Sequence, residues 1–162
     1  MMSTRQSVDA PVQRPDDPLA LERQVCFALV VAARNVVALY RPLLEPMGLT
    51  HPQYLVMLAL WQRAPLSVKE LSGQLQLDPG TLSPLLKRLQ SQGLLRRERD
   101  SEDERLLSVS LTAQGTALRD RAELIPGAVQ KRLGMSTAEL EQLHATLAAF
   151  RTAAELANGA LK

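Results

Sequence analysis

The chain has 162 residues, 46% of them hydrophobic but only 3% aromatic, and a formal net charge of +2. This length predicts a single domain with a core built mostly from leucine, valine and alanine, which favours helices. So small a net charge does not by itself indicate nucleic-acid binding. No apolar stretch approaches the roughly 20 residues that cross a bilayer, and the N-terminus lacks the apolar centre of a signal peptide. We therefore expect a cytoplasmic protein that does not enter membranes.

The N-terminal part is expected to hold a disordered arm followed by a long helix. Residues 1–18 are rich in proline, serine and charged residues without periodicity, which is typical of disorder. Over residues 18–41 apolar residues recur along one broad face, which predicts a helix that needs a partner. Thr50 and Gln53 then have the spacing of a capping box, which predicts that another helix starts there and ends near Pro65.

Residues 66–115 have the pattern of a helix-turn-helix followed by a β-wing. Ser67 and Glu70 form a second capping box, and Asp78 followed by proline and glycine predicts a tight turn and a new helix. Four residues of that helix recur at one face and should point to a core: Leu82, Leu85, Leu86 and Leu89. Two short helices joined by a turn suit insertion of the second into a major groove.

The outer face of this second helix carries the candidate DNA contacts: Thr81, Ser83, Pro84, Lys87 and Arg88. Lysine and arginine can donate to guanine, hydroxyls to phosphates or bases, and the ring of Pro84 could meet a thymine methyl. Pro84 is unusual inside a helix. A helix that starts at Asp78 leaves the Gly80 carbonyl without its bond, whereas a start at Thr81 puts Pro84 in the first turn. From the residues alone, a solvated helix face explains the pattern equally well.

A charged wing is expected after Gly93, which should end the helix. Strands are predicted over residues 94–99 and 105–111, with the acidic segment 100–104 as an exposed tip. Arg105 beside that tip could reach the adjacent minor groove. The module holds as many acidic as basic residues, so DNA binding requires that the two signs be separated in space.

The C-terminal part predicts helices that pair with the first one. Thr112 is expected to cap a helix that runs to residue 133 with a kink at Pro126–Gly127, and a capping box at Ser136 and Glu139 opens a terminal helix. The first and last helices both carry apolar faces, which predicts a two-fold dimerisation region. Such a homodimer would present two recognition helices about one DNA turn apart, so its double-stranded operator should be nearly palindromic.

Cys26 is the only cysteine, so an intramolecular disulfide is excluded. It falls near the apolar stripe of the first helix, about two turns from its expected start, where a small buried hydrophobe is the ordinary interpretation. The alternative is a peroxide sensor whose thiolate is oxidised to a sulfenic acid. That far from the helix N-terminus, neighbouring hydrogen-bond donors would have to support the thiolate. The sulfenic acid would then progress to a mixed disulfide with a low-molecular-weight thiol, or to sulfinic acid.

The sequence LSVKELSGQLQLDPGTLSPLLKRLQSQGLLRRERDSEDERLLSVSLTAQG resembles the winged-helix core of the MarR transcriptional regulators. The segments VCFAL at 25–29, YRPLLEPMGLTHPQYLVMLALW at 40–61 and the break at 125–127 are similar to the organic-hydroperoxide-resistance branch. The resemblance spans about residues 19–150. It implies a mainly α fold with a small β-wing, in which N- and C-terminal helices form a dimerisation region around a winged helix-turn-helix.

The resemblance also implies roles for residues outside the recognition helix. In that branch a wing-tip aspartate orients the arginine that enters the minor groove, and Asp103 and Arg105 occupy these positions. Tyrosine hydroxyls, largely from the other subunit, hydrogen-bond the cysteine. Tyr40 matches one of these tyrosines, while His51 and Val30 stand at two others. His51 can still donate a hydrogen bond and, when charged, favours a thiolate, whereas valine can do neither.

The spacing of Cys26 and Tyr40 agrees with a contact between subunits. Fourteen residues span roughly 21 Å along a straight helix, so Tyr40 cannot touch its own cysteine. Fourteen residues are also nearly four turns, which places both side chains on one face. Two antiparallel first helices could therefore bring Tyr40 of one subunit beside Cys26 of the other.

The expected organisation is a disordered arm (1–18) and one MarR-like domain (19–162), divided into a DNA-binding core (50–115) and a dimerisation region (19–45 and 116–160). The expected function is a homodimeric repressor that senses organic hydroperoxides through Cys26 and then releases its operator. It is not expected to be an enzyme or to need a cofactor or metal. One alternative is a regulator released by a small phenolic or acidic ligand, with Cys26 structural. Another is a thiol peroxidase, which the missing resolving cysteine disfavours.

Overall fold

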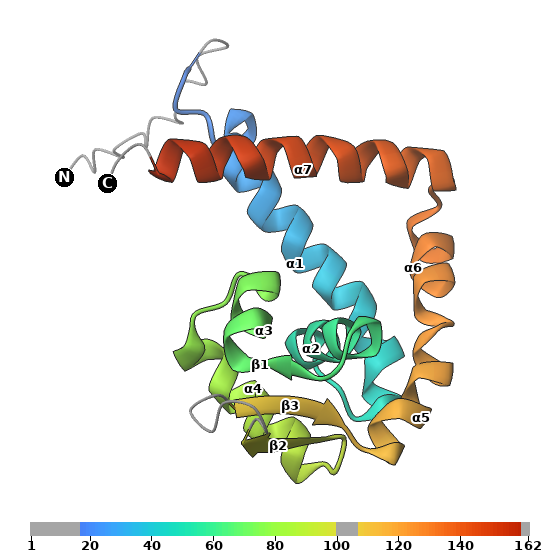
Figure 1. Cartoon of the computed structure of the whole chain (residues 1–162). Coiled ribbons are helices and arrows are strands. Elements are labelled where there is room, and N and C mark those ends of the chain that lie inside the picture. The colour runs from blue at the N-terminus through green and yellow to red at the C-terminus, as the bar shows by residue number, and fades with distance from the viewer. Residues whose placement is uncertain (1–16, 100–106, 160–162) are drawn as a thin grey trace, which may run out of the picture. The chain divides into compact units, whose positions relative to one another are not determined.

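The computed structural model describes residues 17–99 and 107–159 (Figure 1). The fold is mainly helical with a small antiparallel sheet, as the sequence predicts. Two compact units divide the chain, residues 1–36 and residues 37–162, and the division falls inside the first long helix. The expected disordered arm lies outside the described residues up to position 16, and the expected wing tip at 100–104 also lies outside them.

The first long helix begins later than the sequence predicts. A 3-10 turn, η1 (Leu21–Arg23), precedes α1 (Val25–Leu44). Between them the backbone of Gln24 is extended, and its side-chain amide donates to the carbonyl of Pro18 at 2.8 Å. The expected helical start at residue 18 is therefore wrong. Residues 18–23 form a turn instead, and the carbonyls of Pro18 and Ala20 accept from the side chain of Gln24.

The described residues include a helical stretch, Val25–Met47, that is long and apolar enough by length and composition to cross a membrane. The expectation that no stretch reaches this length is therefore wrong. Length and composition are weak evidence, because the core helix of a soluble protein or a signal sequence meets the same criterion. In α1 only Leu44 is buried within this chain. An apolar helix face of this kind is also what a helical protein interface covers.

The reading core consists of short helices and strands in the order η2 (Glu45–Met47), α2 (His51–Gln62), β1 (Leu66–Ser67), α3 (Val68–Leu75), α4 (Pro79–Ser91), β2 (Leu95–Arg99) and β3 (Leu107–Leu111). The predicted caps are confirmed. The Ser67 amide donates to the Glu70 carboxylate at 2.8 Å, and the Thr81 amide donates to the Asp78 carboxylate at 2.9 Å. Gly93 ends α4 with φ 72°, in the left-handed region that glycine favours.

The sheet contains one strand that the sequence did not predict. Its order is β1-β3-β2, and both pairs are antiparallel. In β1, Leu66 lies opposite Val109 and Ser67 lies opposite Ser108. A two-residue strand has no detectable alternation, so only its partner β3 reveals it. This strand ties the start of α3 to the base of the wing.

The hydrophobic core lies between α2, α3, α4 and the sheet. Its fully buried side chains are mostly leucines, including Leu60, Leu66, Leu71, Leu82, Leu86, Leu89 and Leu95. Burying one such side chain stabilises a fold by about 1.5–3 kcal/mol. The predicted stripe of α4 is confirmed, since Leu82, Leu86 and Leu89 are buried and Leu85 packs against the core as a partly buried residue. This packing fixes which face of α4 remains exposed.

Three helices follow the wing: α5 (Ala113–Ala122), α6 (Ile125–Leu133) and α7 (Thr137–Gly159). The chain breaks between α5 and α6 at residues 123–124, before the predicted kink at Pro126–Gly127. Pro126 lies in the first turn of α6, where its missing N–H costs nothing. Its ring instead prevents α5 from continuing past Ala122. The predicted capping box at Ser136 is confirmed by a 2.7 Å bond from its amide to the Glu139 carboxylate.

Candidate nucleic-acid interface and the single cysteine

The outer surface of α4 brings together the five candidate contacts predicted from the sequence. Thr81, Ser83, Pro84, Lys87 and Arg88 are all exposed. They fall on two adjoining helix faces, because residues three or four apart are neighbours on a helix. Lys87 and Arg88 have no ion pair with any described residue, so both cations are available to an anionic partner.

The first turn of α4 is closed by its own side chains. Asp78 accepts from the amide of Thr81 at 2.9 Å and from its hydroxyl at 2.6 Å. The hydrogen bond from the Thr81 hydroxyl, followed by that from its amide, lowers the pKa of Asp78. The helix starts at Pro79, so the second option for Pro84 is wrong: this proline lies in the second turn and leaves the Gly80 carbonyl without its usual donor. The Thr81 hydroxyl donates its proton to Asp78, so its oxygen can only accept a further hydrogen bond.

Two consecutive arginines of β2 place their side chains on opposite sides of the sheet. Arg96 lies on the solvent side of β2, where its Nε contacts Ser110 at 3.0 Å and Glu98 at 3.3 Å. The Nε of Arg97 instead donates to Oε1 of Gln90 on α4, at 2.7 Å. The sequence analysis did not single out this second arginine, although the alternation of a strand places it on the side of Leu95. Asp103 and Arg105 lie outside the described residues.

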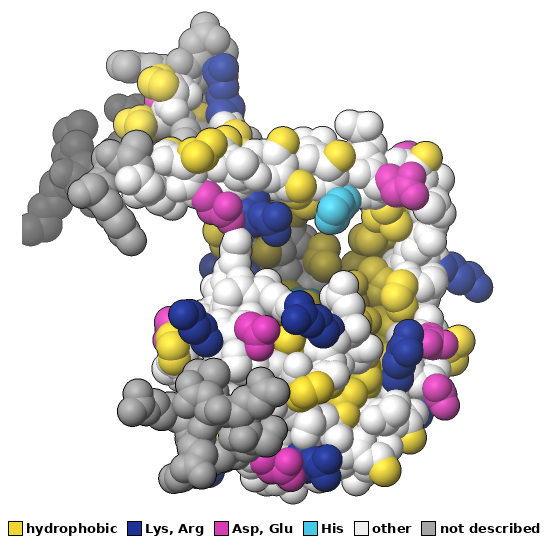
Figure 2. Space-filling view, in the orientation of Figure 1, with side chains coloured by type: hydrophobic (Ala, Val, Ile, Leu, Met, Phe, Trp, Pro, Cys, Tyr) yellow, Lys and Arg dark blue, Asp and Glu magenta, His cyan; other side chains and the backbone are white. Residues whose placement is uncertain are grey.

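Charge on the visible face is mixed in sign. Figure 2 shows Lys and Arg side chains interspersed with Asp and Glu side chains over the surface of the reading core. Several cations are neutralised locally, such as Arg119 by Glu123 at 3.5 Å. The arginine and lysine of α4 pair with no carboxylate among residues 17–99 and 107–159, which is the local separation of charge that DNA binding requires.

Cys26 lies in the first turn of α1 and is exposed. Two expectations are therefore corrected: the cysteine is not two turns inside the helix, and it is not a buried hydrophobe within this chain. The amides of the first turn have no intrahelical acceptor, and the helix dipole is positive at this end. The late start of the helix at Val25 produces this placement.

The other two candidate sensing residues meet each other in the unit formed by residues 37–162. The rings of Tyr40 and His51 lie edge to face with centroids 5.0 Å apart, and Tyr40 also lies 5.9 Å from Tyr54. Tyr54 in turn meets Trp61 at 6.4 Å. Burial lowers the pKa of His51, so near neutral pH this side chain is the uncharged imidazole. The expectation that a charged His51 favours the thiolate is therefore not supported.

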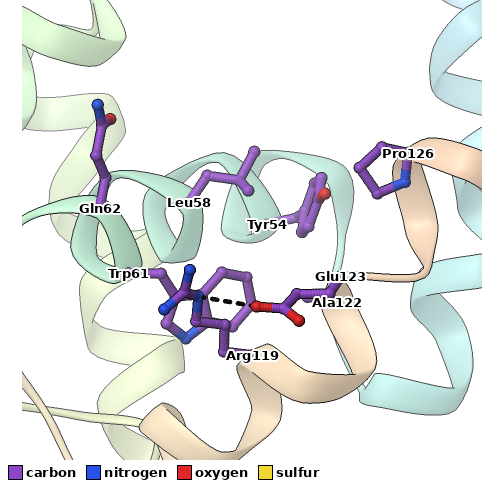
Figure 3. Close-up of a pocket in the computed structure, with 8 residues that line it drawn as sticks. All are labelled: Tyr54, Leu58, Trp61, Gln62, Arg119, Ala122, Glu123 and Pro126. Carbon is purple, nitrogen blue, oxygen red and sulfur yellow. Dashed lines mark ion pairs between the residues drawn. The ribbon is translucent and has the colours of Figure 1, made fainter.

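A cavity of about 580 Å³ opens between α2 and α5, within the same unit. Figure 3 shows Tyr54 and Leu58 along one side, the paired Arg119 and Glu123 opposite them, the ring of Trp61 overlapping Arg119 in this view, and Pro126 at one end. Burial, followed by the charge interaction with Tyr40, raises the pKa of Tyr54, which keeps its hydroxyl protonated. The cavity has the mostly apolar lining with a few polar groups that is typical of small-molecule sites. Nothing in the spacing of these residues along the sequence indicates that they line one cavity.

Proteins similar to this chain are transcriptional regulators. A model of the MarR family matches residues 49–107. The organic hydroperoxide resistance transcriptional regulator of Bacillus subtilis (strain 168) is 44% identical, over 81% of this chain and 89% of that protein. The HTH-type transcriptional regulator TtmR of Methylorubrum extorquens (strain PA1) is 46% identical, over 91% of this chain and 75% of that protein.

Solved structures give the same class of protein. AbfR of Staphylococcus epidermidis superposes with a TM-score of 0.69 and 29% identity, over 83% of this chain and 92% of that one. A structure of reduced AbfR bound to DNA superposes with a TM-score of 0.62 and 33% identity, over 80% of this chain and 93% of that one. CouR from Rhodococcus jostii RHA1, bound to p-coumaroyl-CoA, superposes with a TM-score of 0.70 and 26% identity, over 82% of this chain and 94% of that one.

Proposed function

The chain belongs to the MarR family of transcriptional regulators, and on that basis we propose that it is a homodimeric repressor that releases a near-palindromic operator when organic hydroperoxides oxidise Cys26. The observation that carries the redox part is the exposed position of Cys26 in the first turn of α1. The 44% identity to an organic hydroperoxide resistance regulator supports the same assignment.

The exposed surface of α4 supports the contact with double-stranded DNA. Lys87 and Arg88 supply donors for guanine or phosphate, and Thr81, Ser83 and Pro84 lie closer to the start of the helix. Asp103 and Arg105 remain proposed for the wing tip, by resemblance to the family. AbfR, a protein of similar fold, is bound to DNA in a solved structure, which supports a contact of this chain with DNA. In a helix-turn-helix the second helix, here α4, would enter the major groove.

The exposed apolar side of α7 supports assembly into a homodimer. No residue of this 23-residue helix is buried. Leu143, Leu147 and Phe150 recur at i, i+4 and i+7 and are 44%, 43% and 48% exposed, and Figure 2 shows hydrophobic side chains along α7. Val36 and Val37 of α1 are exposed as well. A second copy would cover these faces and space two recognition helices for one operator.

The chemistry at Cys26 is a two-electron oxidation. The thiolate sulfur attacks the terminal oxygen of the hydroperoxide, the O–O bond breaks, and the leaving alkoxide takes a proton to become the alcohol. Sulfur is oxidised to the sulfenic acid and the hydroperoxide is reduced. With no second cysteine in the chain, the sulfenic acid condenses with a low-molecular-weight thiol and releases water, or a further hydroperoxide oxidises it to the sulfinic acid.

Oxidation would act on DNA through the helix that carries the cysteine. An oxidised or thiol-capped sulfur is larger and more polar than the thiol. In the proposed dimer this change falls on α1, whose last turn packs against the reading core through the buried Leu44. A shift of α1 would then change the separation of the two recognition helices and favour the released state.

The proposed function is tested by recovering DNA from a pool of random duplexes with the full-length protein. The reduced protein should recover a near-palindrome with half-sites about one turn apart. Added cumene hydroperoxide should then release it, with the mass increase confined to the peptide that contains Cys26. Recovery of no preferred sequence would contradict the repressor. Release of DNA by the Cys26→Ser protein under the same treatment would contradict the sensor.

The cavity between α2 and α5 favours a second candidate, a regulator released by a small aromatic acid. Its apolar wall of Tyr54, Leu58 and Trp61 suits an aromatic ring, and CouR, a similar structure, is bound to p-coumaroyl-CoA. Release by salicylate-like compounds that is equal in wild type and Cys26→Ser would support this candidate against the first.

A further inference from the structure

We propose that Arg97, held in place by Gln90, binds a phosphate of the DNA strand that passes between α4 and the wing. This inference rests on the proposed DNA binding. It assigns a contact to an arginine of the wing strand itself, in addition to the residues already proposed on α4 and at the wing tip.

The register of the sheet places Arg97 on the side of the core. Side chains alternate between the two sides of a strand. Leu95 is 2% exposed, and Arg97 lies opposite Val109, which is fully buried, so these three residues share the core-facing side. Arg97 itself is half-buried at the rim of that side. Arg96, one position earlier, projects to the other side, where its side chain is 61% exposed.

Gln90 fixes the guanidinium without neutralising it. Oε1 of Gln90 accepts from Nε of Arg97 at 2.7 Å. An amide oxygen carries no formal charge, and no carboxylate of the described residues pairs with Arg97. The bond uses Nε alone and leaves both Nη groups with their donors. A guanidinium offers these donors as a fixed fork that matches two phosphate oxygens.

The pair lies where a DNA strand would run. Ser83, Lys87 and Gln90 are spaced at i, i+4 and i+7, so Gln90 continues the exposed face of α4 towards the wing. A winged helix that places α4 in a major groove and its wing in the adjacent minor groove has one phosphate backbone between the two. Arg97 joins these two elements through its bond to Gln90. Phosphate oxygens only accept hydrogen bonds, and the two Nη groups only donate.

The salt dependence of binding tests the phosphate contact. Full-length Arg97→Met and Arg96→Met proteins lose the same charge from neighbouring positions on opposite sides of β2. Binding to the selected operator and to an unrelated duplex is measured over a series of salt concentrations. For Arg97→Met the slope of log K against log salt should become shallower by about 0.9 for each phosphate contact. Affinity should fall about tenfold on both duplexes. Arg96→Met should keep the wild-type slope.

The Gln90→Ala protein tests the positioning role. Its affinity should fall in the wild-type background, because the guanidinium is no longer held, but not further when combined with Arg97→Met. An equal additional loss in the double variant would show that Gln90 acts without Arg97 and would overturn the positioning role. A wild-type slope for Arg97→Met, or a loss limited to the operator, would overturn the phosphate contact. A wild-type protein that binds neither duplex at low salt would instead contradict the proposed function.

Discussion

The imidazole of His51 meets the ring of Tyr40 edge to face, with centroids 5.0 Å apart and ring planes at 68°. Tyr40 belongs to the C-terminal half of α1, and His51 is the first residue of α2. The contact therefore connects the helix that carries Cys26 to the first helix of the reading core. Because burial lowers the pKa of His51, the histidine contacts Tyr40 as a neutral ring near neutral pH.

We predict that His51 makes stability depend on pH in the mildly acidic range. The unfolded histidine binds a proton near pH 6.5, whereas the folded one binds it only at lower pH. The unfolded state therefore holds more protons between these two values, so stability is complete above about pH 6.5 and is lost as the pH falls through the folded pKa. The measurement is Tm against pH for wild type and for His51→Phe, which should show less dependence. A wild-type dependence of Tm on pH in the His51→Phe protein would contradict this prediction.

We predict that Gly115→Ala destabilises the reading core. A Cβ at this position would lie 1.9 Å from the carbonyl oxygen of Leu94, and the Gly115 carbonyl accepts from the indole of Trp61 at 2.8 Å. The Leu94 backbone on one side and the bonded Trp61 indole on the other leave little room to move, so the expected cost is about 2–3 kcal/mol, measured by urea unfolding. Gly73→Ala is the matched control: nothing lies within 4 Å of its Cβ, and alanine should stabilise α3 by about 0.5–1 kcal/mol. Equal stability of the two variants would contradict the packing described at Leu94.

Much of the reading core follows from local signals in the sequence. The capping pairs at Ser67 and Asp78 give the starts of α3 and α4, because each side chain bonds an amide within three residues. The leucine stripe of α4 gives its buried face, and hence the exposed positions of Lys87 and Arg88. These features depend on contacts of short range, which sequence spacing encodes directly.

Features that depend on side-chain contacts between different elements, rather than on spacing within one element, could not be predicted in this way. The start of α1 depends on the Gln24 side chain, which bonds the Pro18 carbonyl, and this late start changes the setting of Cys26. The pairing of Arg97 with Gln90 requires the packing of β2 on α4. The family resemblance supplied the roles of Tyr40 and His51, but the low pKa of the histidine follows only from its burial.

We predict that Leu147→Glu prevents assembly of the homodimer. Leu147 lies in the middle of the apolar row of α7 and is 43% exposed in the single chain. In the proposed interface a glutamate at this position would be a buried charge without a partner, which costs roughly 3–5 kcal/mol. Sedimentation velocity should show a monomer at concentrations where wild type is a dimer. Thr152→Glu adds the same charge off this row and should leave the dimer intact. A dimeric Leu147→Glu protein would place the interface elsewhere.

A DNA-binding titration with three protein samples shows whether oxidation of Cys26 releases the operator. The samples are reduced wild type, wild type treated with cumene hydroperoxide, and Cys26→Ser given the same treatment, all titrated on the selected operator at one salt concentration. We predict tight binding by the reduced protein, a loss of affinity of at least tenfold on oxidation, and unchanged tight binding by treated Cys26→Ser. Equal affinity of the reduced and oxidised wild type, with Cys26 shown by mass to be oxidised, would contradict the account.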